Sequence, residues 1–432
     1  MKRSIPFGRA FLVPSAMFLT ALCAVFYSPA PVHAAITAWL DYTDFDTRLS
    51  ELAATATVST YTVGEQTQIR TGILSDLQTI YDGFDVSFTE TRPVTGDYER
   101  LVWGLSTNTT GLLGLADRID LRNLHRNDTS RIYTANFIGI VNEFDGMDQR
   151  DTQLDQLSRA LAGTAAHELA HNLGIEHCDC YAHSGIGPDN YANTNGLQNS
   201  QISATGGTAL NEVGRETLRS FSPWERVKLA YAGGLVAEAP PVLAEQAHVH
   251  DSLDTTQNLS LTNLSVVKAA SAMITGAITA VDEVDYYSFA LLAGQTLTAR
   301  VHSDTPGHIS NPVNSFLSLL APSGAVVFAD DDIEYNRHVF NSGLRSDLYS
   351  LDTFFVNVPV METGIYTLVV SGVGGDTGDY ELLIATNPAS QGAVVVPETS
   401  TGWLGCGGFV LGASVFWRRK RGDICRHVSF VA

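Results

Sequence analysis

Apolar residues in the first half of the chain recur at the three- and four-residue spacing of helices. This spacing predicts an amphipathic helix over Gln66 to Phe84 and a longer helix over Thr152 to Leu173. Gly174 follows the second helix and suits a left-handed C-terminal cap. A third helix is expected to begin after Ser222, because Pro223 and Glu225 follow it in the pattern of a capping box.

Short runs with strand character surround the first helix, and the chain after residue 251 consists almost entirely of such runs, punctuated by Gly and Asp. The sequence therefore predicts an α+β protein, in which a mixed sheet with helices is followed by an all-β sandwich. The expected strands of the first part are Ala38 to Tyr42, Asp85 to Thr89, Leu101 to Leu105 and Asn136 to Val141. Those of the second part are Asp285 to Leu291, Gln295 to Val301, Ser315 to Leu320, Ala325 to Ala329, Gly364 to Val370 and Asp379 to Ile384.

The first 34 residues have the pattern of a secretory signal peptide. Lys2, Arg3 and Arg9 open the segment, and an apolar run follows from Ala10 to Phe26. Cleavage is expected after Ala34, where small residues occupy the required positions. The alternative is an uncleaved membrane anchor. A signal peptide predicts export from the cytoplasm.

The C-terminal end has the layout of a sorting signal. Val-Pro-Glu-Thr-Ser at 396–400 precedes a Gly-rich apolar run from 402 to 417 and the basic cluster 418–421. Residues 397–421 resemble the PEP-CTERM signals of Gram-negative-type bacteria, with Thr399 in place of the second proline. The resemblance implies an exosortase-like processing enzyme as partner, transient anchoring in the inner membrane, and a cytoplasmic tail at 422–432. A sortase-type signal and a plain C-terminal transmembrane helix are the alternatives.

Composition separates a folded body from these two ends. The 432 residues are 44% hydrophobic and 17% charged, which provides enough apolar material for buried cores. The net charge is −20, and both ends are basic, so the body is still more acidic. A nucleic-acid partner is therefore not expected, because phosphate binding needs clustered Lys and Arg. A Pro- and Ala-rich linker at 237–250 and a second linker at 388–396 delimit two domains, 35–236 and 251–387.

Residues 167–177 read His-Glu-Leu-Ala-His-Asn-Leu-Gly-Ile-Glu-His and contain the candidate metal ligands and the candidate general base. His167 and His171 are four residues apart on the second helix, so their imidazoles project from one face. Gly174 lets the chain turn and bring His177 back as a third nitrogen ligand. Three imidazoles leave a fourth position of a tetrahedral zinc open for water, as in catalytic sites. Glu168 is placed to reach that water as a general base.

This eleven-residue pattern resembles the HExxHxxGxxH motif of metzincin zinc metallopeptidases. The resemblance implies a metzincin-like domain at 35–236, with His167, His171 and His177 as zinc ligands and Glu168 as general base. It also implies that substrate lies along an edge strand, for which Leu112 to Ala116 is the candidate. The family places a methionine in a turn beneath the zinc. Here the best match is 202–206, with Ser203 at that position.

Cys178 and Cys180 are the two cysteines of the body and directly follow His177. An exported protein encounters an oxidising compartment, so a Cys178–Cys180 bridge across a turn is expected. The alternative is that one thiolate replaces a histidine on the zinc. Because the segment between the signal peptide and Cys178 contains no cysteine, a thiol-based latency switch in a pro-segment is absent.

Landmarks in 251–387 resemble the bacterial pre-peptidase C-terminal (PPC) domain, an accessory module of secreted peptidases. They include Asp-Tyr-Tyr-Ser-Phe at 285–289, Pro-Ser-Gly at 322–324 and Thr-Gly-Asp-Tyr at 377–380. The acidic run Asp330 to Asp332 offers oxygen ligands for Ca²⁺. The alternative there is a solvated turn whose carboxylates cap backbone amides.

These features together predict a secreted or surface-anchored zinc-dependent endopeptidase acting on protein or peptide substrates, located outside the cell or at its surface. Two alternatives stay open. One is a non-catalytic surface adhesin or scaffold with a degenerate peptidase fold. The other is a zinc hydrolase of a non-peptide bond.

Overall fold

The structure is a computed structural model, which describes residues 35–104, 112–142, 150–182, 200–204, 212–235, 240–246, 250–304, 307–331 and 352–387. All of them belong to one compact unit, Met1–Ser390. We call residues 35–235 the N-terminal region and residues 240–387 the double-sheet region. The predicted signal peptide and the sorting signal lie outside the described residues.

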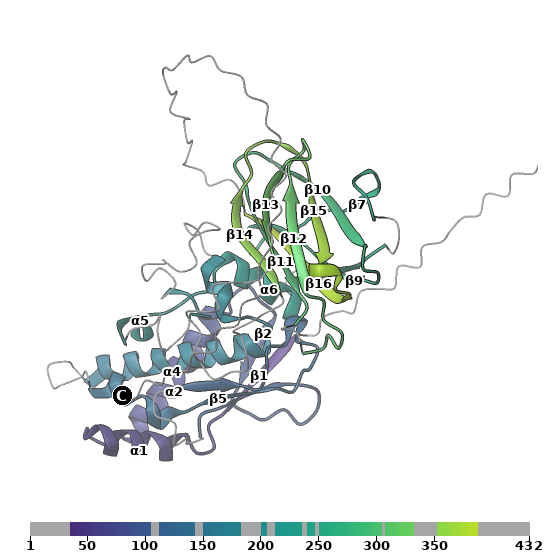
Figure 1. Ribbon diagram of the computed structural model, residues 1–432. Helices are drawn as coiled ribbons and strands as arrows, with labels where there is room; N and C mark the ends of the chain where they lie inside the picture. Colours follow the sequence, from purple (N-terminus) through teal and green to yellow (C-terminus); the bar gives the residue numbers. More distant parts are fainter. Residues whose placement is uncertain are drawn as a thin grey trace, which may run out of the picture. The chain divides into compact units, whose positions relative to one another are not determined.

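The N-terminal region is built on a five-stranded sheet in the order β2-β1-β3-β5-β4 (Figure 1). The first four of these strands are parallel, and β4 pairs antiparallel with β5 at the edge. The strand bounds are β1 Ile36–Asp41, β2 Val86–Thr89, β3 Glu99–Val102, β4 Gly114–Ala116 and β5 Thr129–Ile132. The expected edge strand at Leu112 to Ala116 is thus present as β4.

Helices pack against this sheet, and the two predicted long helices are confirmed. α2 (Val63–Ile80) starts at a capping box between Thr62 and Glu65 and buries the predicted apolar stripe. α4 (Arg150–Asn172) packs against α2 and against β3, β4 and β5. From Ala160 to Asn172 every residue of α4 is buried, so the helix runs through the interior. The remaining helices are α1 (Phe45–Ala56), α3 (Ile138–Asn142), α5 (Glu212–Glu216) and α6 (Pro223–Gly233).

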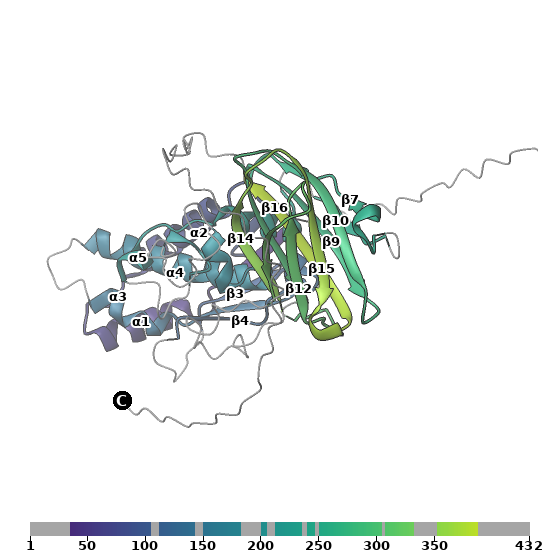
Figure 2. The same cartoon turned by 45° about the horizontal axis from the view of Figure 1, so that its top comes forward.

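The double-sheet region contains two sheets, of orders β13-β12-β15-β10-β7 and β14-β11-β16-β9-β6 (Figure 2). Both contribute to one apolar cluster, which includes Phe289 of β10, Leu368 of β15, Val301 of β11 and Ile384 of β16. The strands are β6 Val242–Ala244, β7 Gln257–Asn258, β8 Thr262–Leu264, β9 Ala269–Ile278, β10 Val284–Leu291, β11 Thr296–His302, β12 Ser315–Leu320, β13 Val326–Asp330, β14 Thr353–Pro359, β15 Gly364–Gly372 and β16 Gly378–Asn387.

The second of these sheets is buried on both faces. Side chains alternate along a strand, and Phe355 and Ile384 enter the cluster between the sheets. Their neighbours Phe354 and Leu383 join the core of the N-terminal region instead. The rings of Trp224 in α6 and Phe354 lie 5.6 Å apart. The hydrophobic core of the N-terminal region therefore includes side chains from both regions.

The predicted strand Asn136 to Val141 is wrong, because these residues form a 3₁₀ turn (Thr134–Asn136) followed by α3. A short apolar run is compatible with either structure. Within the expected linker 237–250, Val242–Ala244 forms β6 and pairs with β9. Among the described residues, no helix has the length and apolar character needed to cross a membrane.

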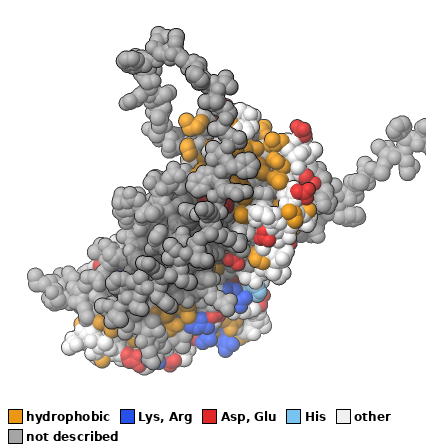
Figure 3. Space-filling view, viewed as in Figure 1, with side chains coloured by type: hydrophobic (Ala, Val, Ile, Leu, Met, Phe, Trp, Pro, Cys, Tyr) orange, Lys and Arg blue, Asp and Glu red, His pale blue; other side chains and the backbone are white. Residues whose placement is uncertain are grey.

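Hydrophobic side chains gather over the upper part of the double-sheet region in Figure 3. Exposed large hydrophobic residues of this region include Val326 and Val327 of β13, Met361, and Ile365 of β15. Lower on this face, acidic side chains, a group of Lys and Arg side chains and further hydrophobic side chains are visible.

Candidate metal centre

The C-terminal half of α4 presents His167 and His171 on one face of the helix. Both are nearly inaccessible to solvent, at 9% and 3% exposure. Their ring centroids lie 4.5 Å apart. The four-residue spacing places the rings one turn apart, as the sequence predicts.

A turn at Gly174 brings the third histidine to the same place. Gly174 has φ +88°, a conformation that L side chains rarely adopt, and a Cβ there would lie 2.5 Å from Cα of Leu121. Its amide donates to the carbonyl of His171 at 2.9 Å, which closes the end of α4. His177 follows at the start of a 3₁₀ turn (His177–Ala182). The expected glycine cap is therefore confirmed.

The three imidazoles converge through their Nε2 atoms. Nε2 of His167 lies 3.0 Å from Nε2 of His171 and 3.2 Å from Nε2 of His177. A tetrahedral zinc with bonds of about 2.0–2.1 Å separates its ligand nitrogens by roughly 3.3–3.4 Å. The spacing of the three rings therefore fits a single metal ion, and the three residues form one of the groups that could hold it.

The other ring nitrogens of the α4 histidines are occupied by backbone carbonyls. Nδ1 of His167 donates to the carbonyl of Ile202 at 2.7 Å, and Nδ1 of His171 donates to that of Ile175 at 2.7 Å. These bonds place the proton on Nδ1, so the Nε2 lone pairs face the metal position. Burial lowers the pKa of all three histidines, so they are neutral, which is the form that binds metal.

Glu168 lies beside this centre, between α4 and the edge strand β4. It is 6% exposed, and burial raises the pKa of its carboxyl to about 8. A backbone hydrogen bond from Ala116 and the charge of Arg219 lower the pKa of this carboxyl, but burial has the larger effect. Gly114 of β4 touches the carboxylate so closely that a Cβ would lie 2.3 Å from its Oε1. The carboxylate thus faces the edge strand.

The segment Gln201–Ala204 lies against the histidines, although it is remote from them in sequence. Beyond the bond from His167, the carbonyl of Ile202 accepts from Nη1 of Arg219 at 3.3 Å. The amide of Ser203 donates to Oε1 of Glu225 at 2.8 Å. The resemblance aligned the overlapping stretch 202–206 with the methionine turn. Its last two residues, Thr205 and Gly206, lie outside the described residues.

The expected Cys178–Cys180 bridge is wrong, because both residues are buried free thiols. Burial also raises the pKa of both thiols well above its usual value. Cys178 contacts Arg300 of the double-sheet region, with Nη1 to Sγ at 2.9 Å. A guanidinium from a distant strand therefore occupies the position beside the sulfur.

Other groups of potential metal donors occur among the described residues, and no local sequence pattern points to them. Glu245, His250 and Asp285 form one, with Nε2 of His250 at 3.3 Å from Oδ1 of Asp285. Glu176, His302 and Asp352 form another, but Lys228 and Arg300 already pair with its carboxylates. Of the acidic run considered for Ca²⁺, Asp332 lies outside the described residues, and Asp330 and Asp331 join no such group.

No protein-family model matches the chain, and no curated protein matches it either. Among solved structures, the pre-peptidase C-terminal domain of a Bacillus anthracis collagenase is 16% identical with a TM-score of 0.19, over 30% of this chain and 93% of that one. A zinc-protease hatching enzyme from Oryzias latipes, high choriolytic enzyme 1, is 11% identical with a TM-score of 0.19, over 45% and 87%. PliG from Aeromonas hydrophila, a periplasmic inhibitor of g-type lysozyme, is 13% identical with a TM-score of 0.21, over 34% and 99%.

TM-scores near 0.2 carry no argument about fold or activity. The chain is a mixed α/β protein with weak similarity to a PPC domain and to a zinc-protease. It also contains a histidine group that could hold a metal ion.

Proposed function

We propose that this protein is a zinc-dependent endopeptidase of the metzincin type. The observation that carries the proposal is the convergence of three neutral imidazoles, with their Nε2 atoms 3.0 and 3.2 Å apart, beside a buried carboxylate. His167, His171 and His177 would hold the zinc, and an open fourth position would face Glu168.

The roles of the residues follow from their positions. Bound zinc would supply a water of pKa ~7 and polarise the scissile carbonyl. Glu168 accepts the proton of the attacking water and transfers it to the leaving amine. The edge strand β4 lies against Glu168, and no strand among the described residues pairs with its outer side, so an extended peptide can pair with it there. Ile202 and Ile175 hold the tautomers of two ligands through their carbonyls.

The test compares the wild type with Glu168→Gln and with the control Glu51→Gln on the exposed side of α1. Wild type and both variants are expected to bind one zinc per chain. Unfolded casein should be cut by the wild type and by Glu51→Gln, whereas Glu168→Gln should lose turnover by at least about a hundredfold.

The alternatives predict other results in the same assay. A non-catalytic scaffold would leave casein intact with or without zinc. A hydrolase of a non-peptide bond would bind zinc and produce no peptides. Equal rates for the wild type and Glu168→Gln would contradict the role given to Glu168.

The cellular location of the protein is also proposed, and the sequence patterns at its two ends support it. We infer export after cleavage behind Ala34, recognition of residues 397–421 by an exosortase-like enzyme, and a PPC-like character for the double-sheet region. The location is then extracellular or at the cell surface. Mass spectrometry of the termini of the natural protein tests both ends. A first residue other than Ala35, or an intact C-terminus at Ala432, would contradict the corresponding step.

A further inference from the structure

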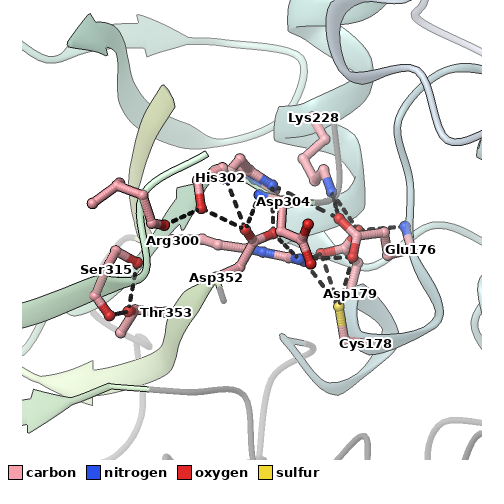
Figure 4. A network of polar contacts seen from close by, with 12 residues as sticks. Glu176, Cys178, Asp179, Lys228, Arg300, His302, Asp304, Ser315, Asp352 and Thr353 are labelled. Atoms are coloured by element: carbon pink, nitrogen blue, oxygen red, sulfur yellow. Dashed lines mark hydrogen bonds and ion pairs between the residues drawn. The ribbon is translucent and has the colours of Figure 1, made fainter. Parts of the chain in front are cut away.

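The neighbours of the third histidine, Glu176, Cys178 and Asp179, belong to a buried polar network (Figure 4). Glu176 and Asp179 flank His177 and Cys178, and their carboxylates enter this network, which contains Lys228 and, from the double-sheet region, Arg300 and Asp352. The amide of Glu176 donates to Oδ2 of Asp179 at 2.7 Å, which closes the segment into a tight turn.

α6 provides the partners from the N-terminal region. Nζ of Lys228 lies 2.7 Å from Oδ2 of Asp179 and 3.4 Å from Oε1 of Glu176. Nε1 of Trp224 donates to Oδ1 of Asp179 at 2.8 Å. Lys228 and Asp179 are both fully buried. One ammonium therefore faces two carboxylates on this side.

Arg300 of β11 completes the network from the double-sheet region. Its Nη2 donates to Oε2 of Glu176 at 2.7 Å and to Oδ2 of Asp352 at 3.0 Å, and its Nη1 donates to Sγ of Cys178 at 2.9 Å. Asp352 is itself anchored, since its Oδ1 accepts from the amides of Ser303 at 2.7 Å and Asp304 at 2.8 Å.

The register of β11 explains why an arginine occupies this position. Ala299 and Val301 enter the cluster between the two sheets. Arg300 lies between them in the strand and points to the opposite face, toward the N-terminal region. It is fully buried there. A buried guanidinium is retained only where carboxylates pair with it, and Glu176 and Asp352 do so from the two regions.

We propose that Arg300 is a positioning residue for the metal centre, and this inference rests on the proposed function. The guanidinium holds Glu176 and Cys178, the two neighbours of His177, in the turn that directs the imidazole at those of α4. The double-sheet region is thereby an integral part of the metal-binding unit and not a detachable module. Without Arg300, Glu176 and Asp179 keep the ammonium of Lys228, Asp352 loses its guanidinium partner, and the turn loses its contact with β11.

The test measures zinc dissociation constants of the full-length chain by competition with a chelator. Arg300→Met is expected to weaken zinc binding by at least tenfold, in the range typical of residues that support metal ligands. It should also change the visible absorption bands of the Co²⁺-substituted protein, because the ligand geometry changes. Arg300→Lys retains the charge and should restore part of the affinity.

Two further variants separate positioning from general stability. Leu368→Ala creates a cavity in the cluster between the sheets and destabilises the fold, but should leave the zinc dissociation constant within twofold. Asp352→Asn keeps Arg300 while removing its anchor, and should weaken zinc binding even if Arg300→Met does not fold. A double-mutant cycle of Arg300→Met with Glu176→Gln should show a combined loss smaller than the product of the single losses.

Wild-type zinc affinity in folded Arg300→Met and in Asp352→Asn, with unchanged Co²⁺ spectra, would overturn the inference. Failure of the wild type itself to bind zinc is a different result, because it overturns the proposed function.

Discussion

Nδ1 of His167 donates a hydrogen bond to the carbonyl of Ile202 at 2.7 Å, across 35 positions of sequence. The bond holds the imidazole in the tautomer whose Nε2 lone pair faces the other two histidines. It also shows where the Ser203 stretch lies, since the next residue is buried and its amide is bound by Glu225. The stretch with Ser203 thus places a backbone carbonyl against the ring of His167.

The first prediction concerns Gly114 on the edge strand. Gly114→Ala is expected to lower kcat/KM on casein by at least about tenfold with zinc content unchanged, because the new Cβ would lie 2.3 Å from Oε1 of Glu168 and displace the carboxylate. Gly64→Ala in the first turn of α2 is the control, since the nearest atom to its Cβ is 3.9 Å away. Full activity of Gly114→Ala would show that the carboxylate works from another position.

The second prediction concerns the buried carboxyl of Glu99 in β3. Burial, and then Asp128 and Asp120, raise the pKa of this carboxyl from 4.5 to about 9. The folded protein therefore keeps a proton that the unfolded chain releases, and stability falls as pH rises from about 4.5 to about 9. Glu99→Gln should raise the melting temperature by several degrees at pH 8 and by almost nothing at pH 5.

Glu65 provides the matched control with the opposite sign. A hydrogen bond from Arg150 is the main cause that lowers the pKa of its carboxyl to about 2. Its contribution to stability is thus present above pH 4.5 and is lost as pH falls toward 2. Glu65→Gln should lower the melting temperature at pH 8 or leave it unchanged. An increase in the control, or none in Glu99→Gln, contradicts the assignment.

The third prediction concerns the buried chain of hydroxyls in the double-sheet region. Tyr287 and Tyr380 share a hydrogen bond of 2.6 Å, and Tyr380 donates to Asp285. Tyr380→Phe removes both bonds and leaves the carboxyl without this donor, so it should cost about 1–3 kcal/mol of unfolding free energy. Tyr287→Phe leaves the bond to Asp285 intact and should cost less. Urea denaturation of both variants measures the difference, and equal losses would contradict it.

The fourth prediction concerns the thiols of Cys178 and Cys180. Both are buried and unpaired, so alkylating reagents should not modify them in the native protein. After denaturation without reductant, the peptide that contains both should carry two alkyl groups in mass spectrometry. A peptide that is unmodified and two mass units lighter would contradict this result, because it would contain a disulfide.

Local sequence signals were sufficient to predict that the two histidines of α4 and the histidine that follows it come together. The four-residue spacing, the helix and the glycine turn are set by neighbouring residues, and they bring His167, His171 and His177 together in the structure. The capping residues Ser222 and Glu225 likewise predicted the start of α6. Strands in which apolar and polar residues alternate clearly were predicted with the correct bounds, as for Ser315–Leu320.

Other features have no local pattern in the sequence. α1 was not predicted, and the run Asn136 to Val141 was taken for a strand, because short apolar segments fit either structure. β14, which has both faces buried, was missed because its residues do not alternate in polarity. The expected disulfide does not form, and Cys178 instead contacts Arg300 in the protein interior. Both the burial and this contact depend on tertiary structure.

The sequence by itself determined that His167, His171 and His177 come together, because spacing along one helix and one turn is sufficient to align them. Only the tertiary structure decided what supports these side chains. Ile202 and Arg300 reach the histidine segment across 35 and 122 or more positions, and each depends on the packing of separate elements. Hydrogen bonds and ion pairs of this range arise from the folded arrangement of the sheets, which local residue patterns do not encode.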